Sequence, residues 1–295
     1  RNDRFILRRP TPAETIGGGF IIDPNGSRYK FGNETIQLLE QKKNGTPLQR
    51  VEDALLKHKS LSKSKLLQET SLSSSVLEEL LENKELLVLP GGDITSVEVM
   101  RETEQLMNSE FAEFHRQNPM RTGYDKARII QFYKNRFKEP LLEHVIRLNL
   151  QAEKWYQSGH FLALKEFSPH VPDQWKRRSE QVLELLKNDG MKPDDLAGYL
   201  KQAGIPADMQ LNLMQFYREQ GKVVHLDDNI AFHQDVFYKA VHRLQEETDE
   251  EFALPEAKDS LGLSRKYLIP FLEKLDSLGY TVRMENKRKW KSSAH

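Results

Sequence analysis

The sequence predicts a mainly α-helical protein with small β-wings, built from tandem winged helix-turn-helix domains. Short β-like runs recur along the chain roughly 60 to 75 residues apart, a period that is typical of repeated small domains. A helix precedes each of these runs. Only the first thirty residues depart from this pattern, because they are rich in strands and turns.

Composition limits the class of protein. The 295 residues include no Cys, which excludes disulfides and thiolate metal sites and is compatible with a reducing compartment. No run reaches the roughly 18 to 20 apolar residues of a membrane helix, so we expect a cytoplasmic protein with no membrane contact. The 44 Lys and Arg balance the 44 Asp and Glu, so any affinity for a polyanion must come from a local patch. No initiating Met is present and the chain begins in a strand-like run, so we expect a part upstream.

The strands are predicted from short β-rich runs. Two of them, Arg4 to Arg8 and Gly19 to Ile22, lie in the first thirty residues and are too few to form an independent sheet. After Phe31 the apolar residues are spaced three and four apart, which predicts helices. The runs that interrupt this pattern are LLVL at 86–89, FLAL at 161–164, VVHL at 223–226 and YTVRM at 280–284.

An apolar helix is expected before each of these runs, and in three cases a shorter helix lies just upstream. The longer helices are predicted over Leu72–Lys84, Glu139–Gln157, Asp208–Gln220 and Ser264–Ser277. Helix, turn, helix and hairpin is the order of a winged helix-turn-helix, whose second helix and wing can contact nucleic acid. Ordinary core packing explains the apolar spacing of any single helix, so only the fourfold recurrence favours this fold. Winged helices also act as spacers and protein-binding modules, so the fold does not decide the function.

The expected organisation is a strand-rich segment followed by four winged helices. Their ranges are 1–30, 31–92, 93–168, 169–230 and 231–295. The second winged helix is the least regular, because a loop containing Pro and Gly separates its helices. The expected joints are Gly91–Gly92, Ser168–Asp173 and Leu226–Asn229.

The start of the last long helix is a candidate phosphate site. Ser264 is the expected N-cap, which leaves Arg265 and Lys266 in the exposed first turn, where free N–H groups favour anions. Pro270 is expected to bend this part of the helix. The predicted buried stripe is Leu268, Ile269, Leu272, Leu275 and Leu278.

Basic residues continue into the predicted wing. Residues 280–295 carry a net charge of +4, whereas residues 244–259 just upstream carry −6. A charge run is usually only a solvated surface, but here the cations fall on the two elements that a winged helix presents to nucleic acid. Tyr267 and Trp290 either stack on an unpaired base or belong to the core.

Other motifs favour neither catalysis nor metal binding. TIGGGF at 15–20 lacks the spacing of a dinucleotide fingerprint and has no P-loop Lys, so it predicts a tight β-turn. The nine His residues are scattered, and His115 has no carboxylate or His at a metal-ligand spacing. We therefore expect no enzyme activity, catalytic residue, metal or cofactor in this chain.

Three stretches share the patterns of one family: GLSRKYLIPFLEKLDSLGYTVRMENKRKW at 262–290, FHRQNP with RTG at 114–123, and RFILRRPTPAETIGGGFIIDP at 4–24. They resemble the last winged helix, the second winged helix and the closing β-barrel strands of the bacterial selenocysteine-specific translation elongation factor. The resemblance is weakest around 33–75. It implies four winged helices in an elongated arm, preceded by a remnant of β-barrel strands.

The resemblance also implies a function and a site. In this family the last domain grips a hairpin of the messenger RNA, so that selenocysteyl-tRNA is delivered to the ribosome at an in-frame UGA codon. GTP and magnesium belong to the full-length factor, and we expect a monomer. The residues that match the family's SRKY helix start and basic wing are Ser264, Arg265, Lys266, Tyr267, Arg283, Lys287, Arg288 and Lys289.

Two other functions remain open. A winged-helix transcriptional regulator would need a dimer and a palindromic DNA site. A protein-interaction scaffold would use its helices for partners and its basic tail for solubility. Neither explains the strands at the N-terminus.

Overall fold

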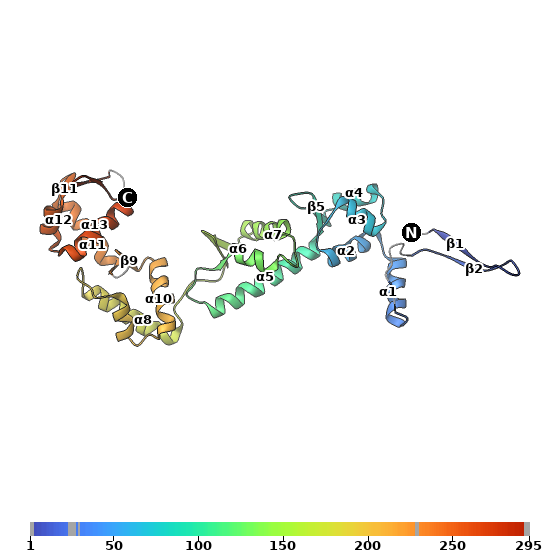
Figure 1. The fold of residues 1–295 in the computed structure, drawn as a ribbon, viewed down its shortest axis with the longest axis horizontal. Coiled ribbons are helices and arrows are strands. Elements are labelled where there is room, and N and C mark those ends of the chain that lie inside the picture. The colour runs from blue at the N-terminus through green and yellow to red at the C-terminus, as the bar shows by residue number, and fades with distance from the viewer. Residues whose placement is uncertain (1–2, 23–27, 29, 228–229, 292–295) are drawn as a thin grey trace. The chain divides into compact units, whose positions relative to one another are not determined.

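The structure is a computed structural model that describes residues 3–22, 28, 30–227 and 230–291. The chain divides into two compact units, one of residues 1–113 and 124–165, the other of residues 114–123 and 166–295. Strands β1 (Arg4–Arg9) and β2 (Glu14–Phe20) form an antiparallel hairpin, and helix α1 (Asn33–Asn44) follows (Figure 1). That the hairpin belongs to a β-barrel, and that the domains form an elongated arm, stay predictions.

Four winged helices follow, which confirms the expected fold class. The first contains α2 (Pro47–His58), β3 (Leu61–Ser62), α3 (Lys63–Thr70), α4 (Ser74–Glu82), β4 (Leu86–Val88) and β5 (Asp93–Ser96). The second contains α5 (Val97–Gln117), β6 (Tyr124–Asp125), α6 (Lys126–Tyr133), α7 (Glu139–Gln151), β7 (Trp155–Ser158) and β8 (Phe161–Leu164). The third contains α8 (Asp173–Asn188), α9 (Leu196–Gln202), α10 (Ala207–Glu219), β9 (Val223–His225) and β10 (Ala231–His233). The fourth contains α11 (Gln234–Glu247), β11 (Glu251–Ala253), α12 (Leu254–Leu261), α13 (Arg265–Ser277), β12 (Thr281–Met284) and β13 (Lys287–Trp290).

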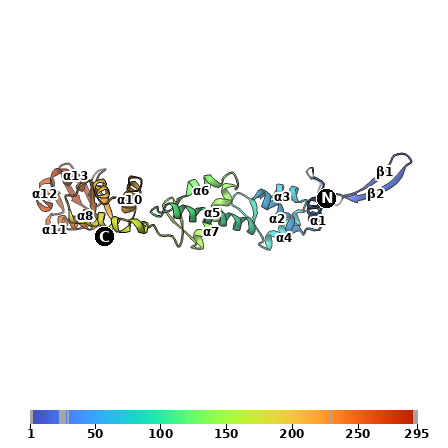
Figure 2. The ribbon, with the colours of Figure 1, turned by 90° about the horizontal axis from the view of Figure 1, so that it is seen from below.

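The sheets are small and antiparallel. In the first, second and fourth domains a short strand before the helix-turn-helix pairs with the second strand of the wing, in the orders β3-β5-β4, β6-β8-β7 and β11-β13-β12. The third domain has only the pair β9 and β10 among its described residues. The helices of the second domain, α5, α6 and α7, lie together in both views (Figure 1, Figure 2). No helix in the described part of the chain is long and apolar enough to cross a membrane.

Two of the expected joints are wing turns instead. Gly91 and Gly92 connect β4 to β5 with φ angles of 97° and 86°, values that favour glycine in a tight turn. Leu226–Asn229 connects β9 to β10, although 228–229 lie outside the described residues. The expected boundaries after 92 and after 230 therefore cut β-hairpins. Sequence composition does not separate the two cases, because linkers and tight turns are rich in the same residue types.

The domains follow one another in two ways. Strand β5 ends at Ser96 and α5 begins at Val97, and likewise β10 ends at His233 and α11 begins at Gln234. Between β8 and α8, by contrast, residues 165–172 form neither helix nor strand, and they include most of the third expected joint, Ser168–Asp173. One division between the two compact units falls after residue 165, in this connection, and the others lie on either side of residues 114–123.

The second domain also corrects a helix length. The predicted helix Glu139–Gln157 ends at Gln151 as α7, and residues 155–158 are strand β7. FLAL is therefore the second strand of its hairpin, whereas the other three runs are the first. Aromatic residues near 155 fit an apolar helix pattern and a strand equally well, and pairing with β8 decides between them.

One local turn recurs in all four winged helices. Two residues after the end of α4, α7, α10 and α13 stand Lys84, Glu153, Gly221 and Gly279, with φ angles of 59°, 52°, 65° and 81°. In each domain the wing strand begins two residues later. Left-handed backbone at this position ends the helix and turns the chain into the wing. Two domains use glycine there, and the first two tolerate a side chain in a conformation that disfavours it.

We expect Lys84→Gly to stabilise the chain. A non-glycine residue with left-handed backbone costs about 1 kcal/mol, and the entropy that glycine gains in the unfolded chain offsets part of this, so a net gain of roughly 0.5 kcal/mol is expected. Thermal denaturation of the two variants and the parent measures it. The matched control is Gly279→Ala, which meets no atom within 4 Å and should destabilise by about 1 kcal/mol through the backbone alone. A Lys84→Gly variant less stable than the parent would contradict the argument.

The hydrophobic cores show that the last two domains share the β9–β10 hairpin. Phe232 of β10 is fully buried with Phe237 and Phe271 of the fourth domain. Its neighbour Ala231 packs in the core of the third domain with Leu213 of α10. Because successive side chains of a strand point to opposite sides, one short strand contributes to two cores.

Burial of His115 is expected to make the stability of the second unit depend on pH. Its ring is 7% exposed and stacks on Phe167 with 3.7 Å between ring centroids. Burial lowers the pKa of His115 from 6.5 to about 4. A buried neutral His stabilises the fold above the unfolded pKa, and this contribution is lost as the pH falls towards the folded value.

We therefore expect the free energy of unfolding to fall by roughly 2 to 3 kcal/mol between pH 7 and pH 4 through this residue. His115→Phe keeps an aromatic ring beside Phe167 but cannot titrate, so its stability should depend less on pH by that amount. Chemical denaturation at both pH values measures the difference. Parallel pH profiles for parent and variant would show that His115 does not carry the effect.

Candidate nucleic-acid interface

Helix α13 buries one stripe against the fourth domain's core. Leu268, Phe271, Leu272 and Leu275 are fully buried, at spacings of three and four residues. The predicted stripe was wrong at two positions, because Ile269 is 39% and Leu278 is 47% exposed. A spacing of three and four selects Phe271 instead, and Leu278 follows the last helical residue. The helix is continuous through Pro270.

The first turn of α13 faces solvent. Ser264 is the N-cap residue, as predicted, but its side chain makes no capping hydrogen bond. Its carbonyl accepts the N–H groups of Tyr267 and Leu268 over 3.1 and 2.9 Å. The N–H groups of Arg265 and Lys266 belong to the first turn, which has no intrahelical acceptor, and both residues are exposed. Serine hydroxyl, backbone N–H groups and two cations thus gather at one helix end.

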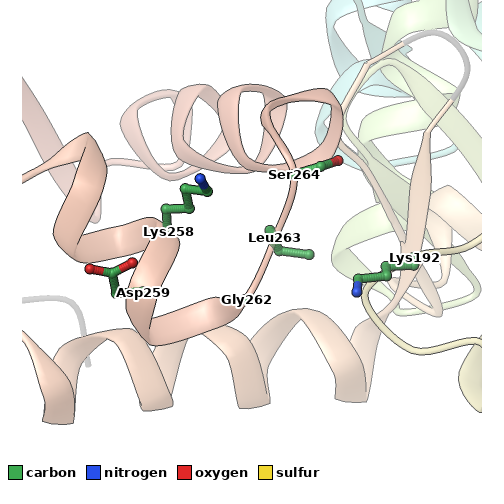
Figure 3. Close-up of a pocket in the computed structure, with 6 residues that line it drawn as sticks. All are labelled: Lys192, Lys258, Asp259, Gly262, Leu263 and Ser264. Atoms are coloured by element: carbon green, nitrogen blue, oxygen red, sulfur yellow. The ribbon is translucent and has the colours of Figure 1, made fainter.

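Two further lysines border this helix start. An open pocket of about 570 Å³ is lined by Lys192, Lys258, Asp259, Gly262, Leu263 and Ser264. Figure 3 shows Lys258 rising from α12 on one side of the Gly262–Ser264 connection and Lys192 on the other. Sequence reasoning missed both. Lys258 is the single cation of an acidic segment, so its place in the sequence only weakly indicates a binding role. Lys192 belongs to the third domain, and no local pattern indicates that it lies beside the start of α13.

The two candidate stacking residues are partly buried, and each makes a hydrogen bond within the protein. The hydroxyl of Tyr267 donates to the carbonyl of Pro193 over 3.1 Å, and the Lys266 ammonium lies 4.9 Å from its ring centroid. Trp290 donates through Nε1 to Thr248 over 3.1 Å and packs beside the core of the domain. For Trp290 the structure shows the core role. A base-stacking role for Tyr267 stays a prediction that would require this hydrogen bond to break.

The wing divides its basic residues between two faces. Neighbouring residues of β13 point to opposite sides, so Lys287 and Lys289 share one face and Arg288 lies on the other. Arg283 stands opposite Arg288 in the pairing of β12 with β13 and is exposed. Lys289 contacts Glu250 over 2.9 Å, and this hydrogen bond raises the pKa of Lys289. The predicted basic wing is thus not a single surface.

Arg288 has a structural partner. Its Nε donates to Asp276 Oδ2 over 3.0 Å, and its side chain is only 12% exposed. The other oxygen of Asp276 accepts the Thr281 hydroxyl over 2.6 Å. This ion pair joins the end of α13 to both strands of the wing. Burial and the ion pair thus give Arg288 a structural role in holding the wing on α13.

The four wing-proximal helices differ in charge. Counting Lys, Arg, Asp and Glu within their bounds, the net charge is −3 for α4, −1 for α7, −1 for α10 and +1 for α13. A helix that approaches a phosphate backbone gains from positive charge. Among these four helices, only α13 of the fourth domain has a net positive charge.

Comparisons with known proteins support the assignment of winged-helix domains. Residues 109–164 and 243–290 match family models for winged helices of elongation factor SelB. A selenocysteine-specific elongation factor from Desulfomicrobium baculatum is 23% identical over 97% of this chain and 47% of its own length. The crystal structure of a bacterial selenocysteine-specific elongation factor, EF-Sec, aligns with 99% of this chain and 45% of its own, at 20% identity and a TM-score of 0.51.

The chain resembles the C-terminal region of SelB. It spans about half the length of the curated relative that it matches, and the likeness to EF-Sec shows the fold alone. The mRNA-binding domain of E. coli SelB, solved in complex with SECIS RNA, aligns with 39% of this chain and 98% of its own, at 18% identity and a TM-score of 0.34. The family model that matches residues 243–290 includes the helix start Ser264–Tyr267 and the wing.

Proposed function

We propose that this chain is the messenger-RNA-binding part of a selenocysteine-specific elongation factor. In this proposal the fourth winged helix binds the hairpin that marks an in-frame UGA codon. The observation that carries it is the start of α13, where Arg265 and Lys266 are exposed and Lys192 and Lys258 line the adjacent pocket. Of the four wing-proximal helices, α13 alone has a net positive charge. Winged-helix models of SelB match two separate parts of the same chain, which supports this assignment.

The contacts act mainly through charge. The N–H groups and cations of the first turn of α13 bind a phosphate, and Lys192 and Lys258 bind the adjacent backbone. Lys287 and Lys289 on the outer face of the wing contact a second part of the hairpin. The shape of an RNA loop then decides specificity, because the deep groove of an RNA helix hides its base edges from side chains.

Other activities belong to the longer factor. GTP hydrolysis with magnesium, binding of selenocysteyl-tRNA and contact with the ribosome require parts that this sequence does not supply, since it carries no phosphate-binding loop motif. We place this chain in the cytoplasm. We expect a monomer, because the proposed site is complete without a second copy of the chain. It carries no catalytic residue in this proposal.

The test is a binding titration of the full chain against an RNA hairpin from a selenoprotein message. Affinity should fall steeply between 50 and 200 mM salt, about 10-fold or more, because phosphate contacts release counterions. A duplex DNA of equal length and a hairpin with a scrambled loop are the controls. Preference for DNA would favour a transcriptional regulator, and salt-insensitive binding to a protein without RNA affinity would favour a scaffold.

A further inference from the structure

The second winged helix carries its positive charge on α6, the first helix of its helix-turn-helix. Residues 126–138 include five Lys or Arg and no Asp or Glu. Counted within the helix bounds, the net charge is +2 for α6, against +1 for α3, +1 for α9 and −1 for α12. The wing-proximal helix of the same domain, α7, has a net charge of −1. The second domain thus places its cations on a different helix from the fourth.

Acidic side chains of the same compact unit neutralise three of these five cations. The ion pairs are Lys126–Glu143, Arg136–Glu102 and Lys138–Asp93. Arg128 and Lys134, by contrast, are exposed and form no ion pair with any residue that the structure describes. Only solvent balances these two charges, which leaves them available to an anionic partner.

An exposed aromatic ring lies between the two unpaired cations. Phe132 follows Arg128 by one helical turn and precedes Lys134 by two residues, and it is 59% exposed. Helical spacing puts Arg128, Gln131 and Phe132 on one face of α6, and Lys134 extends this face as the C-cap in helical conformation. Among α3, α6, α9 and α12, all within the described residues, only α6 exposes a large apolar side chain.

The neighbouring Tyr133 fixes the orientation of this ring. The rings of Phe132 and Tyr133 meet edge to face, with 4.9 Å between their centroids and an interplanar angle of 89°. Tyr133 is 8% exposed, and its hydroxyl donates to the carbonyl of Leu106 over 2.9 Å. A buried and hydrogen-bonded residue thus supports the Phe132 ring before any partner binds, which lowers the entropic cost of stacking on it.

We propose that this face of α6, formed by Arg128, Gln131, Phe132 and Lys134, is a second RNA-binding surface that holds an unpaired strand. Phe132 stacks on a base, the two cations contact the phosphates beside it, and the amide of Gln131 hydrogen-bonds the base edge. The strand is unpaired because only an unstacked base can cover the ring. An acidic protein would satisfy the cations but offers no base to the ring. The choice of RNA as the polyanion rests on the proposed function, whereas the charge and exposure of the surface do not.

A single fluorescent reporter measures binding at this surface in the full chain. The sequence has no Cys, so Asn135→Cys offers one exposed thiol for a dye, next to Lys134 but outside the proposed contacts. Titration with a single-stranded oligoadenylate at low salt should change the dye signal. The affinity should fall as salt rises, because phosphate contacts release counterions. A dye that does not respond to the oligonucleotide at low salt would overturn the proposal.

Substitutions separate the contribution of charge from that of the ring. Combined Arg128→Ala and Lys134→Ala should weaken binding of the oligonucleotide about tenfold and make the slope of log affinity against log salt shallower by about 1.4. Phe132→Leu stays apolar but cannot stack, so we expect a loss of about tenfold, whereas Phe132→Trp should bind at least as tightly as the parent. The matched control is Arg101→Ala, which removes an exposed cation of α5 in the same compact unit and should stay within about twofold.

Poly-glutamate of equal charge tests the alternative of an acidic protein partner. It should bind about tenfold more weakly than the oligonucleotide, because it offers negative charge but no base to stack on Phe132. Equal affinity for the two polyanions would overturn the assignment to RNA. So would equal affinity of the parent and Phe132→Leu for the oligonucleotide, with the fold of both intact by circular dichroism.

This inference and the proposed function fail under different results. If the parent chain binds no hairpin, the proposed function fails, and the dye at position 135 still decides whether α6 binds an RNA strand. If the hairpin binds but the dye does not respond to the oligonucleotide, the inference about α6 alone fails.

Discussion

Combined replacement of Arg265 and Lys266 by Ala is expected to weaken binding of the full chain to the RNA hairpin about 100-fold. Each substitution removes a charged phosphate contact, and roughly 1.4 kcal/mol for each contact gives a factor of ten. The slope of log affinity against log salt should become shallower by about 2, since two fewer counterions are released. Fluorescence anisotropy titrations at several salt concentrations measure both quantities.

The control for this variant is Arg177→Ala, which removes an exposed cation of α8 in the third domain and tests whether loss of positive charge anywhere has the same effect. A combined Lys287→Ala and Lys289→Ala variant should lose less, about tenfold, because Glu250 and Glu251 already lie within 4.0 Å of these ammonium groups. An unchanged affinity in the helix-start variant, with the fold intact, would remove the site from α13.

Replacement of Arg288 by Ala should act on stability instead. It leaves the carboxylate of Asp276 with only the hydroxyl of Thr281 in a half-buried position, which is expected to cost about 2 to 3 kcal/mol of unfolding free energy. Thermal denaturation should show a lower melting temperature for the second unit. Binding of the RNA by the folded fraction should change less than about threefold.

Lys287→Ala is the matched control, because this neighbour lies on the opposite face of the same strand and is 60% exposed. It should change stability by less than about 0.5 kcal/mol. If Arg288→Ala kept full stability and lost hairpin affinity, the sequence-based assignment of Arg288 to the RNA-binding surface would be right and the structural role wrong.

Much of the fold could be predicted because its signals are local. The periods of apolar residues located all four wing-proximal helices, and α10 and α13 begin and end within one residue of expectation. Joints were harder to predict. Gly91 and Gly92 suggest a linker as strongly as a turn, and only pairing of β4 with β5 assigns them to a wing.

The candidate site could be predicted in part. Arg265 and Lys266 were found because a helix start and its cations are adjacent in sequence. Lys192 was not, because it reaches the pocket from another domain. Arg288 was grouped with its basic neighbours because a run of cations in the sequence hides the alternation of side chains along a strand.

The sequence by itself determined the order of elements, the fourfold repeat and the concentration of positive charge in the last domain, because each depends on residues close together along the chain. Only the tertiary structure decided which charged and polar side chains are exposed and which are held by hydrogen bonds or ion pairs. Arg121 reaches Gln215 across 94 residues, Tyr267 reaches Pro193 across 74, and Arg288 reaches Asp276 across 12. Such pairings depend on how domains and strands pack, and no local pattern encodes them.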